Sequence, residues 1–257
     1  MSRARVDFFS EVLGLNTSMT VIFPQETTNL IGMGGSKVIG DVPVLWLLHG
    51  LSDDDTIWER RTSIERYVAE KGIAVIMPQV HRSFYSDQEL GHNYWTYISE
   101  ELPAIASKML HISTKREDNF VAGLSMGGYG AMKLALNHPE RFAAAGSFSG
   151  CLALGHPGNI YDFMERDFEL VFGEREIIGS KDDVLHLLET ADVKKLPELM
   201  VTCGTDDFLW HESQAFMAIA KQRGIPVHTN FGPGDHVWEY WDASIQEFLD
   251  WIKIRTA

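Results

Sequence analysis

Cysteine is scarce in this sequence, which has only Cys151 and Cys203 among 257 residues. Two cysteines are too few for a disulfide framework, and this pair lacks the close spacing of metal ligands. Free cysteine is among the most buried residue types, so we expect both side chains to pack in the core. The scarcity argues against a disulfide-stapled scaffold and against a cysteine-based metal centre.

Basic residues are also in short supply. The chain has 22 Lys and Arg against 36 Asp and Glu, which gives a formal net charge of −14. A field of this sign repels polyanions. Nucleic acids and anionic membrane surfaces are therefore not expected as partners.

Long apolar runs are missing as well. No stretch approaches the roughly 18 apolar residues of a membrane-spanning helix. The N-terminal segment carries two arginines and then meets Asp7 and Glu11, so it offers no uninterrupted apolar core of a signal peptide. These absences predict a cytoplasmic protein that does not enter a membrane.

Apolar residues make up 45% of the chain and aromatic residues 11%, which is enough for a large core. Short apolar runs alternate with amphipathic segments, and this alternation predicts an α/β fold in a single domain over residues 1–257, with a mainly parallel sheet flanked by crossover helices. We expect strands at 19–23, 44–48, 73–77, 120–124, 143–148, 198–203 and 226–231, and helices at 56–70, 94–110, 126–137, 212–223 and 238–254.

The regular alternation of predicted strands and helices is interrupted between residues 152 and 190. This stretch is rich in glycine, proline and charge, and it is longer than an ordinary connection. We expect a cap-like insertion over the edge of the sheet. The glycine-rich residues 31–36 lack the strand-to-helix context and the following Lys-Ser/Thr of a phosphate-binding loop, so they predict an ordinary loop or hairpin.

The sharpest chemical signal is Gly123-Leu124-Ser125-Met126-Gly127-Gly128, which lies between a predicted strand and a predicted helix. This context is typical of a nucleophile elbow. The glycines two residues before and after Ser125 relieve crowding where the chain turns sharply and holds the serine at an unfavourable backbone angle. The pattern predicts that Ser125 is a catalytic nucleophile presented above the sheet.

A serine hydroxyl is protonated at neutral pH, so it needs a histidine to accept its proton and a carboxylate to orient that histidine. In α/β-hydrolases these partners follow the serine in the order acid, then histidine, after later strands. Asp206 and Asp207 follow one later predicted strand, and His236 follows the next. We therefore predict a triad of Ser125, Asp207 and His236, with Asp206 as the alternative acid.

Negative charge develops on the substrate carbonyl oxygen during attack, and two backbone N–H groups must stabilise it. One is expected from Met126, the residue after the nucleophile, at the start of a helix. The other is expected from Leu51, which follows His49-Gly50 at the end of a predicted strand. His49 itself comes too early in the chain order to be the catalytic base.

Two further groups of residues have a simpler interpretation. Three adjacent carboxylates at Asp53, Asp54 and Asp55 cannot converge like spaced ligands, so a solvated turn is favoured over a metal site. Aromatic side chains are more often core than pocket, but some could line an acyl or alcohol pocket. The candidates are Phe84, Tyr85, Tyr94, Trp95 and Trp210.

These motifs resemble those of the esterase D, or putative esterase, family, and specifically its small bacterial tributyrin-esterase branch. The resemblance spreads over most of the chain, and its Gly-Thr-Asp-Asp-Phe-Leu block places the family's acid on Asp207. The matching blocks are LLHGLSDDDTIW (47–58), YISEELPAIA (97–106), GLSMGGYGAMKLAL (123–136), HPERFAAAGSFSG (138–150), CGTDDFL (203–209) and GDHVWEYW (234–241).

The resemblance implies an α/β-hydrolase fold and a serine carboxylesterase that hydrolyses short-chain acyl esters. It implies no cofactor or metal, a small-molecule ester as partner, and a homo-oligomer. Feruloyl and carbohydrate acetyl esterases, S-formylglutathione hydrolases and secreted mycolyltransferases are similar, so hydrolysis of other esters or thioesters and acyl transfer stay open. The loop after Leu51 lacks the cysteine that S-formylglutathione hydrolases usually carry there. A non-catalytic binding protein on the same fold is the remaining alternative.

Overall fold

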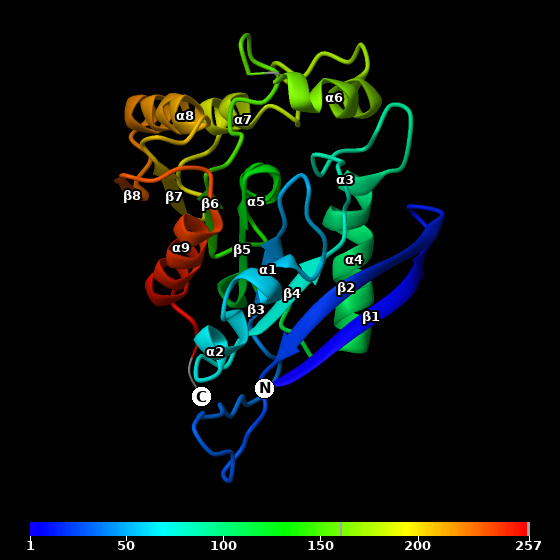
Figure 1. The fold of residues 1–257 in the computed structure, drawn as a ribbon, viewed down its shortest axis with the longest axis vertical. Helices are drawn as coiled ribbons and strands as arrows, with labels where there is room; N and C mark the ends of the chain where they lie inside the picture. The colour runs from blue at the N-terminus through cyan, green and yellow to red at the C-terminus, as the bar shows by residue number, and fades with distance from the viewer. Residues whose placement is uncertain (160, 256–257) are drawn as a thin grey trace.

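One sheet organises the molecule. In the computed structural model, which describes residues 1–159 and 161–255, eight strands pair in the order β1-β2-β4-β3-β5-β6-β7-β8 (Figure 1). The strands from β4 to β8 run parallel, whereas β2 pairs antiparallel with both β1 and β4. The bounds are β1 Ser2–Ser10, β2 Leu15–Phe23, β3 Val44–Leu48, β4 Ala74–Pro78, β5 Asn119–Leu124, β6 Ala144–Phe148, β7 Glu198–Gly204 and β8 Val227–Gly232.

The seven strands expected from the sequence are all present, with bounds that shift by a few residues at most. The sequence analysis missed β1, in which Arg3, Arg5 and Asp7 alternate with Ala4, Val6 and Phe8. This strand lies at the edge of the sheet, and most of its residues are exposed. Edge strands often carry charged side chains, so such a strand lacks the continuous apolar run that marks the central strands.

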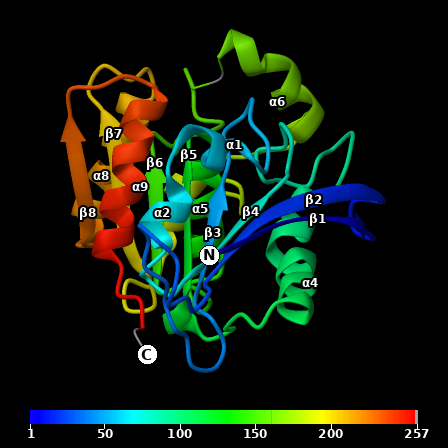
Figure 2. The same cartoon turned by 60° about the horizontal axis from the view of Figure 1, so that its bottom comes forward.

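Helices cover both faces of the sheet. Figure 2 shows α1, α2 and α9 in front of the sheet and α5 and α8 behind it; α7 packs between α5 and α8 in the rear layer. The bounds are α1 Ile57–Arg61, α2 Ile64–Val68, α3 Tyr94–Thr96, α4 Leu102–Met109, α5 Met126–Asn137, α6 Glu165–Phe172, α7 Val184–Thr190, α8 Trp210–Arg223 and α9 Trp238–Trp251. Shorter segments are the π-helical η1 Tyr97–Glu101 and the 3₁₀ turns η2 Arg116–Asp118 and η3 Asp162–Met164.

The sheet divides the core into two apolar clusters. In β3, Val44, Trp46 and Leu48 pack on the α4, α5 and α8 side, while Leu45 and Leu47 pack on the side of α1, α2 and α9. Successive side chains of a strand point to opposite faces, so a strand buried on both faces is continuously apolar. This is why 44–48 was recognisable as a strand without any alternation.

The expected single helix over 56–70 is wrong: the structure has two short helices, broken at Thr62. Thr62 is extended, its hydroxyl donates to the Trp58 carbonyl (2.6 Å), and the N–H of Ile64 donates to the same hydroxyl (3.2 Å). A threonine that bonds the backbone in this way competes with helix continuation.

The expected helix at 94–110 forms, but with an internal change of pitch. A π-helical segment, Tyr97–Glu101, precedes Pro103, which lies in the first turn of α4. Proline has no N–H to donate to the preceding turn, and a helix start is the position that tolerates it.

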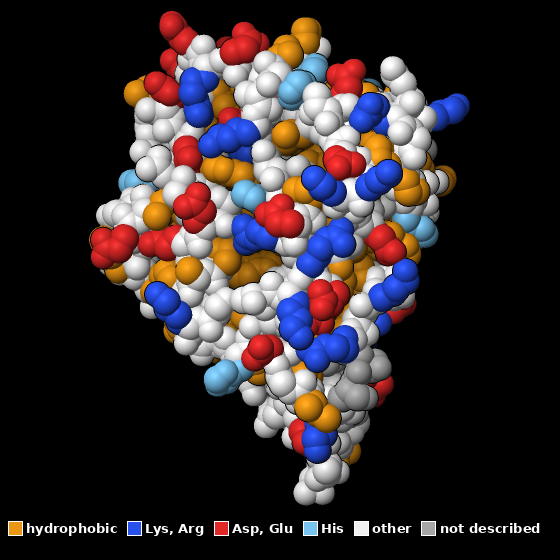
Figure 3. Space-filling view, turned by 180° about the vertical axis from the view of Figure 1, so that it is seen from behind, with side chains coloured by type: hydrophobic (Ala, Val, Ile, Leu, Met, Phe, Trp, Pro, Cys, Tyr) orange, Lys and Arg blue, Asp and Glu red, His pale blue; other side chains and the backbone are white. Residues whose placement is uncertain are grey.

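Among the described residues, no helix combines the length and the apolar character that crossing a bilayer requires. On the face seen in Figure 3, basic side chains lie among acidic ones.

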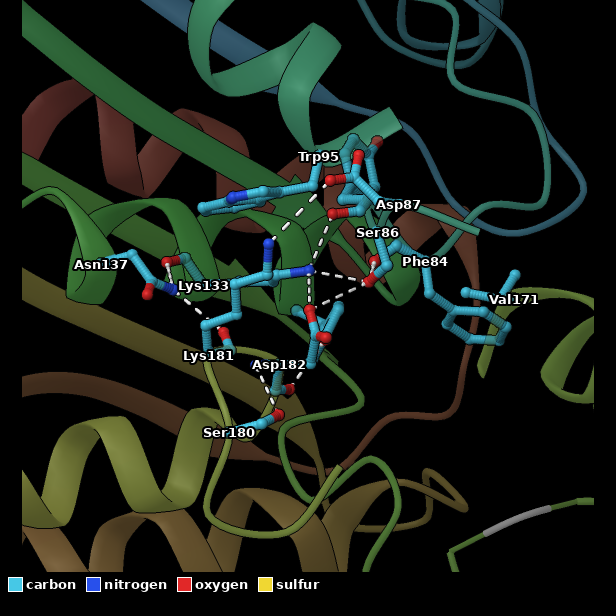
Figure 4. A network of polar contacts seen from close by, with 12 residues as sticks. Phe84, Ser86, Asp87, Trp95, Lys133, Asn137, Val171, Ser180, Lys181 and Asp182 are labelled. Atoms are coloured by element: carbon cyan, nitrogen blue, oxygen red, sulfur yellow. Dashed lines mark hydrogen bonds and ion pairs between the residues drawn. The ribbon is translucent and has the colours of Figure 1, made fainter. Parts of the chain in front are cut away.

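A buried lysine on α5 connects three segments that are distant in the sequence (Figure 4). Lys133 is fully buried; its Nζ donates to the carbonyl of Tyr85 (2.9 Å) and the hydroxyl of Ser86 (2.7 Å), and it forms an ion pair with Asp182 (2.5 Å). The same nitrogen lies 4.6 Å from the centre of the Trp95 ring. Burial lowers the pKa of Lys133 to about 8, against the opposing effect of Asp182.

The first prediction concerns this ion pair. In the Lys133→Met variant the buried carboxylate of Asp182 loses its counter-ion, and we expect the free energy of unfolding to fall by about 3–5 kcal/mol. Urea denaturation monitored by circular dichroism measures it. The matched control is Lys253→Met, which removes an exposed ion pair with Glu198 and should change stability little. Equal effects in the two variants would contradict the assigned role.

Candidate active site

Ser125 occupies the sharp turn between β5 and α5. Its backbone angles are φ 52° and ψ −120°, in a region that non-glycine residues rarely adopt. Its N–H donates to the carbonyl of Phe148 (2.9 Å), which ties the turn to the neighbouring strand β6. The turn also requires glycine: a Cβ at Gly127 would lie 2.4 Å from the carbonyl oxygen of Leu48, and one at Gly123 would meet the backbone of Gly127.

The structure brings together three side chains that are far apart in the sequence. The Nε2 atom of His236 lies 3.0 Å from the hydroxyl oxygen of Ser125. Its Nδ1 atom lies 3.0 and 2.9 Å from the two carboxylate oxygens of Asp207. This is the order of contacts that a serine nucleophile, its base and an orienting acid require.

Asp207 is the buried member of this set. Its side chain is fully shielded from solvent, whereas that of His236 is 18% exposed. Burial alone would raise the pKa of Asp207, but hydrogen bonds from His236 and from the Leu209 N–H outweigh it and hold the pKa below its ordinary value. The carboxylate therefore stays ionised, so that it can orient and stabilise a protonated imidazole.

Backbone contacts hold the acid-bearing loop against the histidine-bearing loop. The N–H of Thr205 donates to Gly232 (2.9 Å), and that of Asp206 donates to Gly234 (2.9 Å). The Asp206 carboxylate in turn accepts the Gly234 N–H at 3.4 Å. Of the two candidate acids, only Asp207 has a hydrogen bond to His236 among the described residues.

The two residues expected to supply the oxyanion donors line the same cavity as Ser125. Leu51 and Met126 line the cavity into which Ser125 opens. Met126 is the first residue of α5, and the first N–H groups of a helix have no acceptor within it. Within the described part of the chain, the N–H of Leu51 has no hydrogen-bond acceptor either. Two residues that line the cavity with Ser125 thus each have an N–H group available for a ligand.

A cavity of about 630 Å³ opens over Ser125. Loops at the carboxyl ends of the strands form one side of it, and residues between β6 and β7 form another. Figure 2 shows α6 of this intervening segment above the carboxyl ends of the strands. The apolar and aromatic lining residues are Leu51, Phe84, Leu124, Met126, Cys151, Tyr161, Phe163, Met164, Phe208, Leu209, Val237, Trp238 and Trp241, and charged residues at it are Asp53, Arg61, Arg82 and Glu239.

The aromatic pocket residues expected from the sequence are largely wrong. Tyr94 lines a separate cavity beyond the Leu51 loop, Trp95 is buried against His138 and Lys133, and Trp210 packs on Phe231. Their helices turn these rings into the core or away from the serine. Of the wider aromatic group, Phe84 lines the cavity at Ser125.

The aromatic wall comes instead from residues beside the catalytic loops and from the 152–190 segment. Phe208 directly follows Asp207, and its ring lies 4.6 Å from that of His236. Phe163 packs edge-on against Phe208 at 6.0 Å. Phe208 could have been predicted to line the cavity, because it directly follows the predicted acid, Asp207. Phe163 reaches the cavity only because the segment between β6 and β7 folds back towards it, so its place in the lining could not be predicted from neighbouring residues.

A buried glutamate supports this wall. Glu212, on α8, accepts hydrogen bonds from the N–H of Ala153 (2.7 Å) and from the hydroxyl of Tyr161 (3.1 Å). Both partners belong to the segment that leads over the cavity. Burial raises the pKa of Glu212 to about 7, although these two hydrogen bonds oppose the shift. The sequence analysis missed Glu212, since an acidic residue in a helix is ordinary.

Helix α6 is also tied down by an ion pair. The guanidinium of Arg82 donates to both carboxylate oxygens of Asp167 at 2.8 and 2.7 Å.

In the described residues, no three His, Cys, Asp or Glu side chains come together in a way that could hold a metal ion.

Comparisons with known proteins relate the chain to esterases. Residues 35–252 match the family model described as "Putative esterase". An "Acetyl esterase" of Caldicellulosiruptor saccharolyticus is 28% identical, and the alignment covers 98% of each chain.

Solved structures are similar over the same length. The Staphylococcus aureus fluorophosphonate-binding serine hydrolase FphF superposes with a TM-score of 0.85 at 34% identity, and the S-formylglutathione hydrolase FrmB of S. aureus with a TM-score of 0.83 at 34% identity; both alignments cover 98% of each chain. The predicted α/β-hydrolase fold is confirmed.

The second prediction concerns the titration of Glu212. A carboxyl whose pKa is higher in the folded than in the unfolded state lowers stability as the pH rises from the unfolded value, 4.5, through the folded value of about 7. Glu212→Gln removes this charge. We expect the variant to gain stability relative to the unsubstituted protein when the pH is raised from 5 to 8, as measured by urea denaturation at both pH values. The exposed Glu189→Gln is the control and should show no such pH dependence.

Proposed function

The chain belongs to the family described as "Putative esterase" and is a carboxylic ester hydrolase, and we propose that it cleaves short-chain acyl esters through an acyl-enzyme. In this proposal Ser125 is the nucleophile, His236 the general base and Asp207 the orienting acid. Leu51 and Met126 supply the oxyanion donors.

One observation carries the proposal: the unbroken line of hydrogen bonds from Asp207 through His236 to Ser125. His236 contacts Ser125 at 3.0 Å through one ring nitrogen and Asp207 at 2.9 Å through the other. A proton bound on Nδ1 and shared with the carboxylate leaves Nε2 as the acceptor that faces the serine hydroxyl. The imidazole is thus in the tautomer that accepts a proton from the nucleophile.

Acylation begins when the Ser125 oxygen attacks the ester carbonyl while its proton passes to Nε2 of His236. The carbonyl oxygen becomes an anion, which the N–H groups of Leu51 and Met126 stabilise. The intermediate then collapses: the bond to the alcohol oxygen breaks, and the protonated imidazole gives its proton to the leaving alkoxide. The acyl group stays bound to the serine.

Deacylation repeats these events with water. His236 takes a proton from water as its oxygen attacks the acyl-serine carbonyl, and the same two N–H groups stabilise the new oxyanion. Collapse then releases the carboxylic acid, and the proton returns to the Ser125 oxygen. None of these proposed steps requires a cofactor.

The proposal of a short acyl group is supported by the similarity to the protein named acetyl esterase. Thioester hydrolysis is the second candidate, favoured by the similarity to the FrmB S-formylglutathione hydrolase. The triad serves both, because an acyl-serine forms from either leaving group. We also propose that residues 152–190, apart from residue 160, which lies outside the described residues, form a small cap, since Tyr161, Phe163 and Met164 line the cavity.

The tributyrin-esterase character, the cytoplasmic location and the homo-oligomer stay predictions. Feruloyl and carbohydrate acetyl ester hydrolysis and acyl transfer also stay open.

The third prediction tests the triad. With p-nitrophenyl butyrate, Ser125→Ala is expected to lower kcat on the order of 10⁶-fold, and Asp207→Asn about 10⁴-fold, because the asparagine favours the wrong imidazole tautomer. His236→Ala should resemble Ser125→Ala. Circular dichroism establishes that each variant folds. The matched control is Asp206→Asn, which should retain most activity; turnover retained by Ser125→Ala would reject the assignment.

The fourth prediction addresses the substrate. Across p-nitrophenyl esters from acetyl to octanoyl, kcat/KM is expected to be highest for acetyl to butyryl. Feruloyl esters, acetylated sugars and S-formylglutathione are assayed in parallel, with and without a competing alcohol. A thioester hydrolysed with a higher kcat/KM than every oxygen ester would favour the second candidate instead.

A further inference from the structure

We infer that His49 is a positioning residue that fixes the oxyanion-binding peptide between Gly50 and Leu51. The inference rests on the proposed function, and it adds a residue that the triad and the two N–H donors do not include. His49 is a buried histidine that has no role in the acylation and deacylation steps proposed above.

The hydrogen bonds of His49 define its tautomer. The ring is buried, and its Nε2 lies 3.1 Å from the N–H of Val80, which can only donate. The proton of a neutral ring therefore lies on Nδ1, which donates to the carbonyl of Gly50 at 2.7 Å. Burial lowers the pKa of His49 to about 4, so the ring is neutral at physiological pH.

The carbonyl that His49 contacts belongs to the same planar peptide as the N–H of Leu51. The C=O and N–H of a trans peptide point in opposite directions. A donor that fixes the Gly50 oxygen on one side therefore fixes the direction of the Leu51 N–H on the other. Leu51 lines the cavity, and its N–H has no acceptor among the described residues.

Further contacts hold this peptide and the preceding one, between His49 and Gly50. The Gly50 oxygen also accepts the N–H of Asp53 (3.2 Å), and the Gly50 N–H donates to the Asp53 carboxylate (3.2 Å). On the other side, the hydroxyl of Tyr85 donates to the carbonyl of His49 (2.9 Å). Tyr85 itself is held through its carbonyl by Lys133. The oxyanion peptide is thus part of a buried network that reaches α5.

Glycine is required at the centre of this arrangement. A Cβ at Gly50 would lie 2.7 Å from the Leu124 side chain and 2.8 Å from the Asp53 carboxylate. The close approach lets the imidazole, the carboxylate and the peptide share one small space. Rotation of the peptide would break both hydrogen bonds to the Gly50 oxygen.

Two substitutions distinguish the roles of the two ring nitrogens of His49. The amide of His49→Asn can place a donor near the position of Nδ1 but does not reach Val80. The longer amide of His49→Gln can reach Val80 near the position of Nε2 but leaves the Gly50 oxygen without its donor. If Nδ1 positions the oxyanion peptide, Asn retains kcat better than Gln, even where both variants lose similar stability.

The experiment measures kcat and KM for p-nitrophenyl butyrate together with the rate ratio between an ester and its thionoester. Sulfur is a poor hydrogen-bond acceptor, so this ratio reports how well the oxyanion donors are aimed. For His49→Gln we expect kcat to fall about 10² to 10³-fold with KM nearly unchanged, and the ratio to fall in parallel. His49→Asn should recover at least tenfold of the lost kcat.

The matched control is His92→Gln. His92 also places its Nδ1 against a backbone carbonyl, that of Leu13 at 2.8 Å, but it does not line the cavity. It should leave kcat and the rate ratio unchanged. Should His49→Gln fail to fold, Tyr85→Phe replaces it, and a fall in both kcat and the rate ratio is expected there too.

The outcomes separate this inference from the proposed function. If the unsubstituted protein hydrolyses the ester, Ser125→Ala does not, and His49→Gln keeps both kcat and the rate ratio, the role of His49 is rejected while the triad stands. Equal losses in His49→Asn and His49→Gln with an unchanged rate ratio would also reject it, because they indicate a structural role only. An unsubstituted protein that neither hydrolyses the ester nor reacts with a fluorophosphonate overturns the proposed function and the inference together.

Discussion

The chemistry that we propose for this molecule depends on one hydrogen bond, between His236 and the hydroxyl of Ser125. Much of the architecture maintains it. The strained turn at Ser125 presents the hydroxyl, the backbone bonds between the β7 and β8 loops set the position of the imidazole, and the buried carboxylate of Asp207 keeps the ring in one tautomer. Parallel strands place all three loops at one edge of the sheet, because their carboxyl ends coincide.

The sequence allowed much of this to be predicted. The strands β3 to β7 are buried, largely apolar runs between helical segments, and the turn at Ser125 carries glycines where backbone atoms approach within contact distance. These features are local, so they leave a local signal. The choice of Asp207 over Asp206 needed the resemblance to a family, because two adjacent carboxylates after one strand look alike.

Most of what could not be predicted depends on tertiary contacts, and one feature, the break at Thr62, depends on a local side-chain contact. The break at Thr62 arises from a side chain that bonds the backbone on both sides of it. The aromatic wall forms where Phe163, from the inserted segment, meets Phe208. The tie between Glu212 and Tyr161 joins residues 51 positions apart. None of these partners is visible from spacing, and the rings of Tyr94, Trp95 and Trp210 were assigned to the pocket for that reason.

The buried pair of Lys133 and Asp182 has a consequence for how such a scaffold can change. One partner lies in α5, the helix that begins directly after Ser125, and the other lies in the connection that follows α6. A graft that exchanges the 152–190 segment for that of another enzyme would bring a new substrate-facing surface and would also remove the lysine's counter-ion. Modular exchange of this segment therefore has to carry Asp182 along, or replace both charges at once with apolar groups of matching volume.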